Sequence, residues 1–96
     1  MDKGIMLSVL IPVYGVEKYM ARCAESLFNQ SIGEGIEYIF VDDRSPDGSV
    51  AVLETVVARY PGRKEQVTVV HHEKNQGLAG ARLTGLKHAR GKYIIV

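Results

Sequence analysis

Two adjacent aspartates, Asp42 and Asp43, follow the apolar residues Tyr38–Val41 and precede a loop that contains proline and glycine. Neighbouring carboxylates can act as an acid–base pair, accept hydrogen bonds from a nucleotide base or other ligand, or cap the next helix. Successive side chains on a strand point to opposite faces, which argues against a shared-proton pair. We therefore favour ligand binding for Asp43 and structural support for Asp42.

The same loop offers a calcium-binding alternative. Asp43, Ser45, Asp47, Gly48 and Glu54 have the spacing of an EF-hand loop. An EF-hand needs a helix before the loop, whereas Tyr38–Val41 is β-branched or aromatic without polar alternation, as in a strand buried on both faces. Calcium binding is therefore kept only as a minor alternative.

Two further patterns could suggest a ligand. The sequence has no G-x-x-x-x-G-K-[ST] motif, and Gly77–Gly80 is not G-x-G-x-x-G, so no phosphate-cradling glycine loop is predicted. His71 and His72 are consecutive and would point to opposite faces of a strand, so they cannot easily share a metal ion. We predict a surface or helix-packing role for both histidines.

The elements that must position these side chains alternate along the chain. The first strand is predicted at Leu7–Tyr14, with Pro12 ending it because proline cannot donate to a ladder. The other predicted strands cover the run before Asp42, Gln66–His71 and Tyr93–Val96, and the predicted helices are Glu17–Gln30, Ser49–Tyr60 and Leu78–Arg90. This βαβαβαβ order predicts an α/β fold, a Rossmann-like parallel sheet with helices on both faces.

Details of two helices follow from the same patterns. In the first helix, one stripe is expected to face the core, and it contains Met20, Cys23, Ala24, Leu27 and Phe28. Ser45 is expected to be the N-cap of the helix after the acidic loop, with Pro46 in its first turn and Asp47 near its positive end.

Composition limits the class of protein. The 96 residues, 46% hydrophobic and 24% charged, are typical of one small soluble domain. Met1–Ala58 carries 4 basic and 9 acidic residues and Arg59–Val96 carries 8 basic and 2 acidic, which could form a basic face but is more typical of solvated helix surfaces. A single cysteine and the lack of about 20 consecutive apolar residues predict a cytoplasmic chain, or one peripheral to the inner face of a membrane.

Five segments together resemble family 2 glycosyltransferases, in order and over about residues 7–96. They are Ser8–Tyr14, Ser26–Ser31, Val41–Ser49, Asn75–Arg82 and Gly91–Ile94. The resemblance implies an inverting, nucleotide-sugar-dependent enzyme, with this chain forming the N-terminal half of a GT-A fold. It also implies the strand order third, second, first, fourth, which leaves residues 93–96 on a sheet edge.

The resemblance also implies where a nucleotide would bind. Tyr14 would lie against the base, Asp43 would accept from a base N–H, and the segment from Asn75 to Arg82 would form the adjacent wall, with Gly77 in an unusual backbone conformation. The complete set of candidate nucleotide-binding residues is Pro12, Val13, Tyr14, Asp42, Asp43, Asn75, Gly77 and Arg82.

The sequence departs from the family pattern in several places. Gly15, Arg44 and Leu83 replace residues that are usually asparagine, glycine and asparagine. The D-x-D motif that would hold Mn or Mg, and the catalytic carboxylate, would both follow Val96, so no catalytic or metal-binding residue is assigned within residues 1–96.

The leading hypothesis is that residues 1–96 form a truncated nucleotide-sugar-binding subdomain of a glycosyltransferase that is inactive alone. The expected donor is a UDP-sugar, the acceptor is a glycan or lipid-linked acceptor bound by a missing C-terminal part, and no nucleic acid partner is expected. Mn or Mg is expected only in the full-length enzyme. The alternative is a stand-alone or vestigial nucleotide-binding module, and self-association through edge strand 93–96 is expected in either case.

Overall fold

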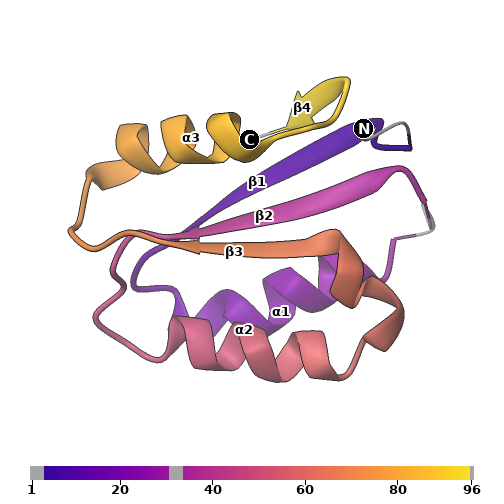
Figure 1. The fold of residues 1–96 in the computed structure, drawn as a ribbon. Helices are drawn as coiled ribbons and strands as arrows, with labels where there is room; N and C mark the ends of the chain where they lie inside the picture. The colour runs from indigo at the N-terminus through magenta and orange to yellow at the C-terminus, as the bar shows by residue number, and fades with distance from the viewer. Residues whose placement is uncertain (1–3, 31–33, 96) are drawn as a thin grey trace.

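The protein forms one parallel four-stranded sheet covered by three helices. The computed structural model describes residues 4–30 and 34–95. The elements are β1 (Leu7–Val13), α1 (Glu17–Phe28), β2 (Ile36–Asp42), α2 (Ser49–Ala58), the 3₁₀ helix η1 (Pro61–Gln66), β3 (Val67–His71), α3 (Gly77–His88) and β4 (Tyr93–Ile95). The strand order is β3-β2-β1-β4, and all three pairs are parallel (Figure 1). The predicted α/β fold and βαβαβαβ order are confirmed.

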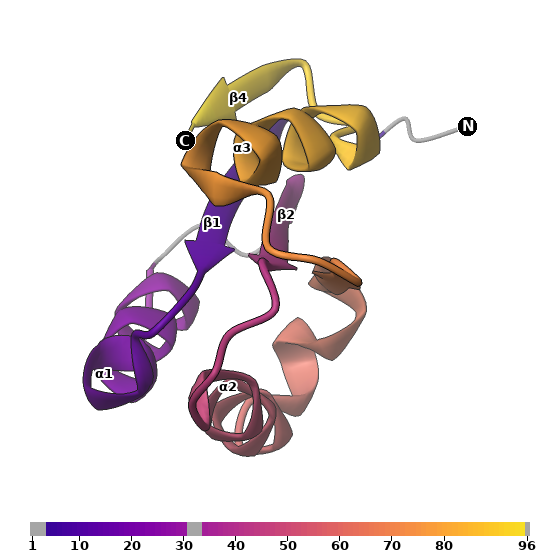
Figure 2. The ribbon, with the colours of Figure 1, turned by 90° about the vertical axis from the view of Figure 1, so that its left-hand side faces the viewer.

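Strand β2 is the buried centre of the fold. Helices α1 and α2 lie on one face of the sheet and α3 on the other (Figure 2). Tyr38 and Phe40 pack toward α1 and α2, whereas Ile39 and Val41 pack toward α3. Because both faces are covered, β2 lacks the polar alternation of a half-exposed strand. Successive side chains of a strand point to opposite faces of the sheet, so Asp42 and Asp43, at the end of β2, also point to opposite faces.

The predicted end of the first strand at Pro12 is wrong, because Pro12 lies inside β1. The Val13 carbonyl accepts the Asp43 N–H at 3.1 Å on the β2 side, and the Met6 carbonyl accepts the Tyr93 N–H at 2.8 Å on the β4 side. In a central parallel strand, the backbone N–H and C=O groups of successive residues point to the two neighbouring strands in turn. Because the backbone groups of Val13 point to β2, those of Pro12 point to the β4 side. In the described residues the β1–β4 pairing runs from Leu7 to Val9, and the nitrogen of Pro12 faces away from β2, so its missing N–H interrupts no bond of the β1–β2 ladder.

Two expectations about the helices are also wrong. Helix α2 begins at Ser49 after an N-cap at Gly48, and Ser45 lies outside it because Asp47 already accepts the Ser49 N–H at 3.0 Å. Cys23 is exposed, whereas Met20, Ala24 and Phe28 of α1 are buried. The core-facing stripe of α1 is therefore narrower than predicted.

A buried carboxylate fastens the β4 end of the sheet. Glu37 on β2 is 2% exposed. Its carboxylate accepts hydrogen bonds from the Arg90 N–H, at 2.6 Å, and from the Ser8 hydroxyl group. Ser8 Oγ accepts the Gly91 N–H at 2.8 Å, and a Cβ at Gly91 would lie 2.7 Å from the Ser8 nitrogen, so no side chain fits there. Burial raises the pKa of Glu37, but the hydrogen bonds from Ser8 and Arg90 and the Arg90 charge outweigh it and hold the pKa below its ordinary value.

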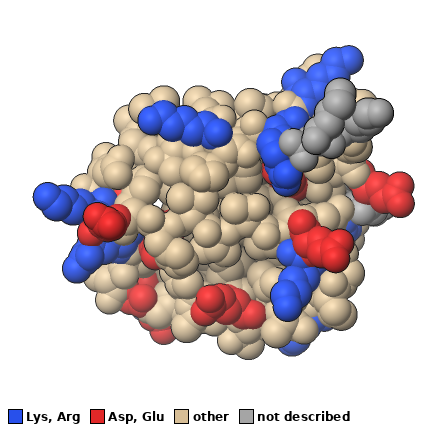
Figure 3. Space-filling model, viewed as in Figure 1, with Lys and Arg blue, Asp and Glu red and all other residues tan. Residues whose placement is uncertain are grey.

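The surface shows how the charges are distributed. On the face in Figure 3, Lys and Arg side chains lie in separate groups with Asp and Glu among them, as expected for solvated helix surfaces. Among the helices of the described residues, none has the length and apolar character needed to cross a membrane. Ser31, at the end of the segment Ser26–Ser31, and Val96, at the end of the predicted strand Tyr93–Val96, lie outside the described residues.

Candidate functional site

A cavity of about 350 Å³ lies beyond the carboxyl ends of β1 and β2, where open α/β sheets bind ligands. Its walls come from the end of β1, the loop after β2, and the start of α3. The lining residues are Pro12, Tyr14, Val16, Asp43, Asn75, Gly77, Leu78 and Ala81. Five of the eight candidate nucleotide-binding residues, Pro12, Tyr14, Asp43, Asn75 and Gly77, are thus brought together.

A larger hollow of about 580 Å³ lies between α2, η1 and the first residues of β3. Apart from Glu54 and Lys64 its lining is apolar, with Pro61, Val67 and Val69 among the residues. The smaller cavity combines an aromatic ring, a carboxylate and an amide, which are the few converging polar groups expected of a ligand site. We therefore take the smaller cavity as the candidate site.

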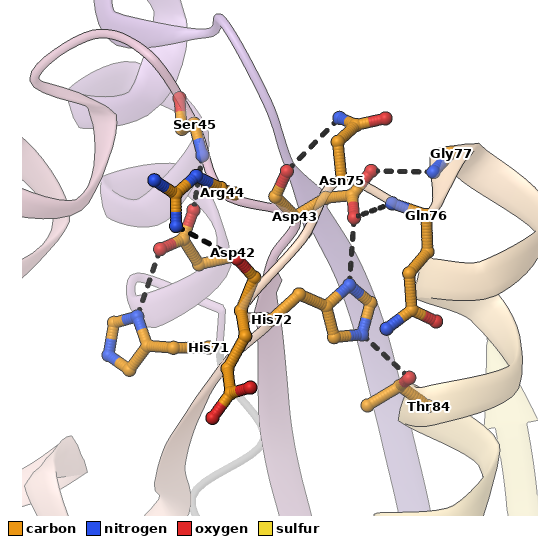
Figure 4. Close-up of polar contacts among 11 residues, drawn as sticks. Asp42, Asp43, Arg44, Ser45, His71, His72, Asn75, Gln76, Gly77 and Thr84 are labelled. Carbon is orange, nitrogen blue, oxygen red and sulfur yellow. Dashed lines mark hydrogen bonds and ion pairs between the residues drawn. The ribbon is translucent and has the colours of Figure 1, made fainter.

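Asp43 is the most firmly held polar side chain in this cavity. It is 3% exposed. Its Oδ1 accepts from His72 Nδ1 at 2.8 Å and from the Gln76 N–H at 2.7 Å, and its Oδ2 accepts from the Gly77 N–H at 2.8 Å (Figure 4). A carboxylate has about four acceptor positions, so one position on Oδ2 remains for a ligand.

The surroundings of Asp43 keep it ionised. Burial raises the pKa of its carboxyl, but the hydrogen bonds from His72, Gln76 and Gly77, with the charge interaction with His72, hold the pKa below its ordinary value of 3.8. Gln76 is the N-cap of α3, so the carboxylate also lies at the positive end of that helix. Asp43 is therefore an acceptor-only group at neutral pH.

Asp42 points away from this cavity. Its Oδ2 lies 2.9 Å from His71 Nδ1, and its Oδ1 accepts the Ser45 N–H at 2.9 Å (Figure 4). The divergence predicted for the two aspartates is present. Both contacts of Asp42 are with its own chain, one of them to a His71 side chain that is 56% exposed.

The other candidates differ in how they meet the cavity. The Tyr14 side chain is 52% exposed and free to contact a ligand, and Asn75 Nδ2 donates to the Asp43 carbonyl at 3.1 Å. Gly77 has a φ of 79°, so the unusual backbone angle expected there is confirmed. Val13 is fully buried in the core, and Arg82 lies exposed on α3; neither lines the cavity.

Two departures from the family pattern occupy left-handed backbone positions. Arg44, where glycine is usual, has a φ of 56°, and Gly15, where asparagine is usual, has a φ of 64°. Glycine and asparagine are the residues that adopt this region most readily. Arg44 remains there with its guanidinium donating to the Glu73 carbonyl at 2.8 Å, which links the loops after β2 and β3.

Tyr14 is positioned by two helix N-termini that cap each other. The Gly15 N–H donates to Ser45 Oγ at 2.9 Å, the Glu17 N–H to Asp47 Oδ2 at 3.2 Å, and the Gly48 N–H to Glu17 Oε1 at 2.7 Å. Hydrogen bonds from Ser49 and Ser45 hold the pKa of Asp47 well below its ordinary value. The loop that carries Tyr14 is therefore fixed to the acidic loop.

The structure does not support the calcium alternative. Strand β2 precedes the loop, and the carboxylates of Asp43 and Asp47 accept hydrogen bonds from their own chain. Across residues 4–30 and 34–95, no group of three or more His, Cys, Asp or Glu side chains could hold a metal ion. The described residues therefore do not fit calcium, Mn or Mg.

Sequence reasoning missed several residues at the site. His72 and Thr84 support Asp43 from outside the cavity, and Val16, Leu78 and Ala81 complete the lining. The separation of 12 residues between His72 and Thr84 does not indicate a contact in the sequence, because the contact forms only when α3 packs against β2. A polar residue at the end of a strand, beside a predicted binding loop, is the one available signal for His72.

The sequence itself identifies the family. The model of the family described as Glycosyl transferase family 2 matches residues 8–96. The chain belongs to glycosyltransferase family 2. It is 41% identical over 88 residues to the minor teichoic acid biosynthesis protein GgaB of Bacillus subtilis (91% of this chain, 9% of GgaB). It is 38% identical over 91 residues to the poly(ribitol-phosphate) beta-glucosyltransferase of Bacillus spizizenii (93% and 14%).

Solved structures of glycosyltransferases show the same fold. Residues 1–349 of S. aureus TarS in complex with UDP superpose with a TM-score of 0.80 at 28% identity, covering 96% of this chain and 27% of that chain. The mannosyltransferase PcManGT from Pyrobaculum calidifontis, in complex with GDP-Man and Mn2+, has a TM-score of 0.84 at 24% identity, covering 92% and 25%. The GT-A architecture is thereby confirmed for this chain, which spans between 9% and 34% of the curated relatives.

Proposed function

We propose that this chain supplies the nucleotide-sugar pocket of a glycosyltransferase that transfers a sugar from a nucleoside-diphosphate donor to an acceptor hydroxyl. The observation that carries the proposal is the convergence of Tyr14, Asp43 and Asn75 on one cavity beyond the ends of β1 and β2. The UDP complex of TarS, a structural relative, supports a uridine diphosphate sugar as donor. We assign donor binding to this chain and no catalytic residue.

In the proposed complex, each side chain has a separate task. The exposed Tyr14 ring offers a flat surface for stacking of the base. The open acceptor position on Asp43 Oδ2 accepts a ring N–H of the base. The Asn75 side chain donates a hydrogen bond to the backbone carbonyl of Asp43, and Asn75 borders the same cavity. The pocket therefore recognises the base, and groups outside the described residues would act on the sugar.

Acceptor and metal are proposed from relatives, and location is proposed from the composition of the chain. GgaB is named for teichoic acid biosynthesis and another relative is a chondroitin synthase, which supports a glycan or lipid-linked acceptor. Mn2+ in the PcManGT complex supports a divalent metal in the full-length enzyme. We propose a cytoplasmic location, peripheral to the inner face of a membrane. The second candidate is a nucleotide-binding module without transferase activity, since the residues that converge on the cavity account for base binding alone.

Replacing Tyr14 with alanine is expected to weaken UDP binding about 5- to 150-fold, because base stacking on an aromatic ring contributes about 1–3 kcal/mol. The melting temperature should change little, since half of the Tyr14 side chain is exposed. Isothermal titration calorimetry with UDP measures the affinity, and scanning calorimetry measures the melting temperature. Tyr19→Ala is the matched control, because Tyr19 is 69% exposed and lies outside this cavity. Equal UDP affinity in both variants would refute the role of Tyr14.

We also propose that the chain self-associates through β4, which forms one edge of the sheet and exposes Tyr93, Ile94 and Ile95. The Tyr93 N–H faces β1, so the N–H of Ile94 faces outward. Ile94→Pro removes that donor and should lower the average mass by light scattering, whereas Ile94→Thr keeps the donor and should associate more. A wild-type monomer at high concentration would contradict the proposal.

A further inference from the structure

His72 connects the candidate site to α3 without entering the cavity. Its side chain is 5% exposed. His72 Nδ1 lies 2.8 Å from Asp43 Oδ1, and its Nε2 lies 2.7 Å from Thr84 Oγ1 on α3 (Figure 4). A buried imidazole with both nitrogens bonded is held in one orientation.

The partners of His72 determine how its protons are arranged. Asp43 is ionised and can only accept, so His72 Nδ1 must carry a hydrogen. The Thr84 hydroxyl can accept from Nε2 when that nitrogen carries a hydrogen and donate to it when it does not, so both contacts of the ring are satisfied in either form. The result is a continuous chain of hydrogen bonds that joins Thr84, His72 and Asp43.

This chain limits the orientation of the Asp43 carboxylate. Oδ1 accepts from His72 and from the Gln76 N–H, whereas among the described residues Oδ2 accepts from the Gly77 N–H alone. If the His72 bond were lost, the carboxylate could rotate about its terminal torsion, which is intrinsically broad. The open acceptor position would then lose its fixed direction toward the cavity.

We propose that His72, held by Thr84, is a positioning residue that fixes Asp43 so that the pocket prefers bases presenting a ring N–H. This inference rests on the proposed function and names a determinant of base choice within that site. Uracil presents such an N–H, whereas cytosine presents an acceptor ring nitrogen at the corresponding position and would face the carboxylate with like polarity. A diphosphate of uridine should bind more tightly than one of cytidine.

The test compares UDP and CDP affinities in wild type and three variants of the 96-residue chain. His72→Leu keeps the volume but removes the donor, and should weaken UDP binding about 10- to 150-fold with little effect on CDP, as expected if the base loses one hydrogen bond to a charged group. His72→Asn places an amide N–H near Nδ1 and should retain most of the UDP preference. Thr84→Val should lower that preference less than His72→Leu.

The outcomes separate the two proposals. If wild type binds neither nucleotide, the proposed function fails and this inference fails with it. If wild type binds UDP but His72→Leu weakens UDP and CDP by the same factor, His72 is only structural and the positioning role is overturned. A second readout is the pKa of Asp43, measured by carboxyl ¹³C NMR, which should rise in His72→Leu and remain nearer to wild type in His72→Asn. An unchanged pKa in His72→Leu also overturns the role.

Discussion

Replacing Asp43 with asparagine is expected to weaken UDP binding about 10- to 150-fold and to lower the free energy of unfolding by about 2–4 kcal/mol. The carboxylate accepts from His72 on Oδ1 and from the Gly77 N–H on Oδ2. An asparagine has one oxygen, so its NH₂ group must face one of these donors in either orientation. The same change converts the open acceptor position toward the cavity into a donor or displaces it.

Asp42→Asn is the matched control, since it alters the adjacent carboxylate on the opposite face of β2. Its contacts are to the exposed His71 and to the Ser45 N–H, and the asparagine oxygen can still accept from Ser45. We expect UDP affinity within about twofold of wild type and a loss of stability below about 1 kcal/mol. Titration calorimetry with UDP and urea unfolding measure the two effects. If both variants lose UDP affinity equally, the carboxylate facing the cavity has no special role.

Replacing Glu37 with glutamine is expected to lower the free energy of unfolding by about 2–4 kcal/mol, without a direct effect on the cavity. Glu37 Oε2 accepts from Ser8 and the Arg90 N–H, while Oε1 accepts from the Arg90 guanidinium. A glutamine must direct its NH₂ group at one of these donors. Because Arg90 is 47% exposed, we attribute most of the loss to Ser8 and the backbone N–H rather than to the ion pair.

The pH dependence of this effect follows from the lowered pKa of Glu37. The native state favours the ionised form of the Glu37 carboxyl group. The stabilisation from this carboxylate is therefore fully present above the ordinary pKa of 4.5 and is lost as the pH falls through the lower native pKa. The difference in unfolding free energy between wild type and Glu37→Gln should therefore shrink below about pH 4.5. Urea unfolding at a series of pH values measures it, with Glu65→Gln as an exposed control. A difference independent of pH would contradict the ionised buried carboxylate.

Much of the fold was predictable because it depends on local patterns. The apolar run Tyr38–Val41 without alternation identified a strand buried on both faces, and strand geometry alone separated Asp42 from Asp43. The family resemblance then predicted the strand order, which the structure confirms. The buried strand and the divergence of the two aspartates need no knowledge of distant contacts, whereas the strand order came from the family resemblance.

The errors concern residues whose environment is set by distant parts of the chain. Pro12 is tolerated within β1 because its nitrogen faces away from the β2 ladder, and Ser45 lies outside α2 because Asp47 accepts a hydrogen bond from the Ser49 N–H. His72 gains its role only when β3 and α3 bring it between Asp43 and Thr84. Helical periodicity likewise could not show that Cys23 lies at the exposed margin of the α1 stripe.

The most direct test of the proposed nucleotide pocket is a UDP titration of the 96-residue chain followed residue by residue with ¹H–¹⁵N NMR. We predict saturable shifts of the amide signals of Tyr14, Asp43, Asn75 and Gly77, which border the cavity. Val57 and Lys64, in the larger hollow between α2 and β3, should remain unchanged. Saturable shifts confined to that hollow, or no shifts at millimolar UDP, would contradict the account.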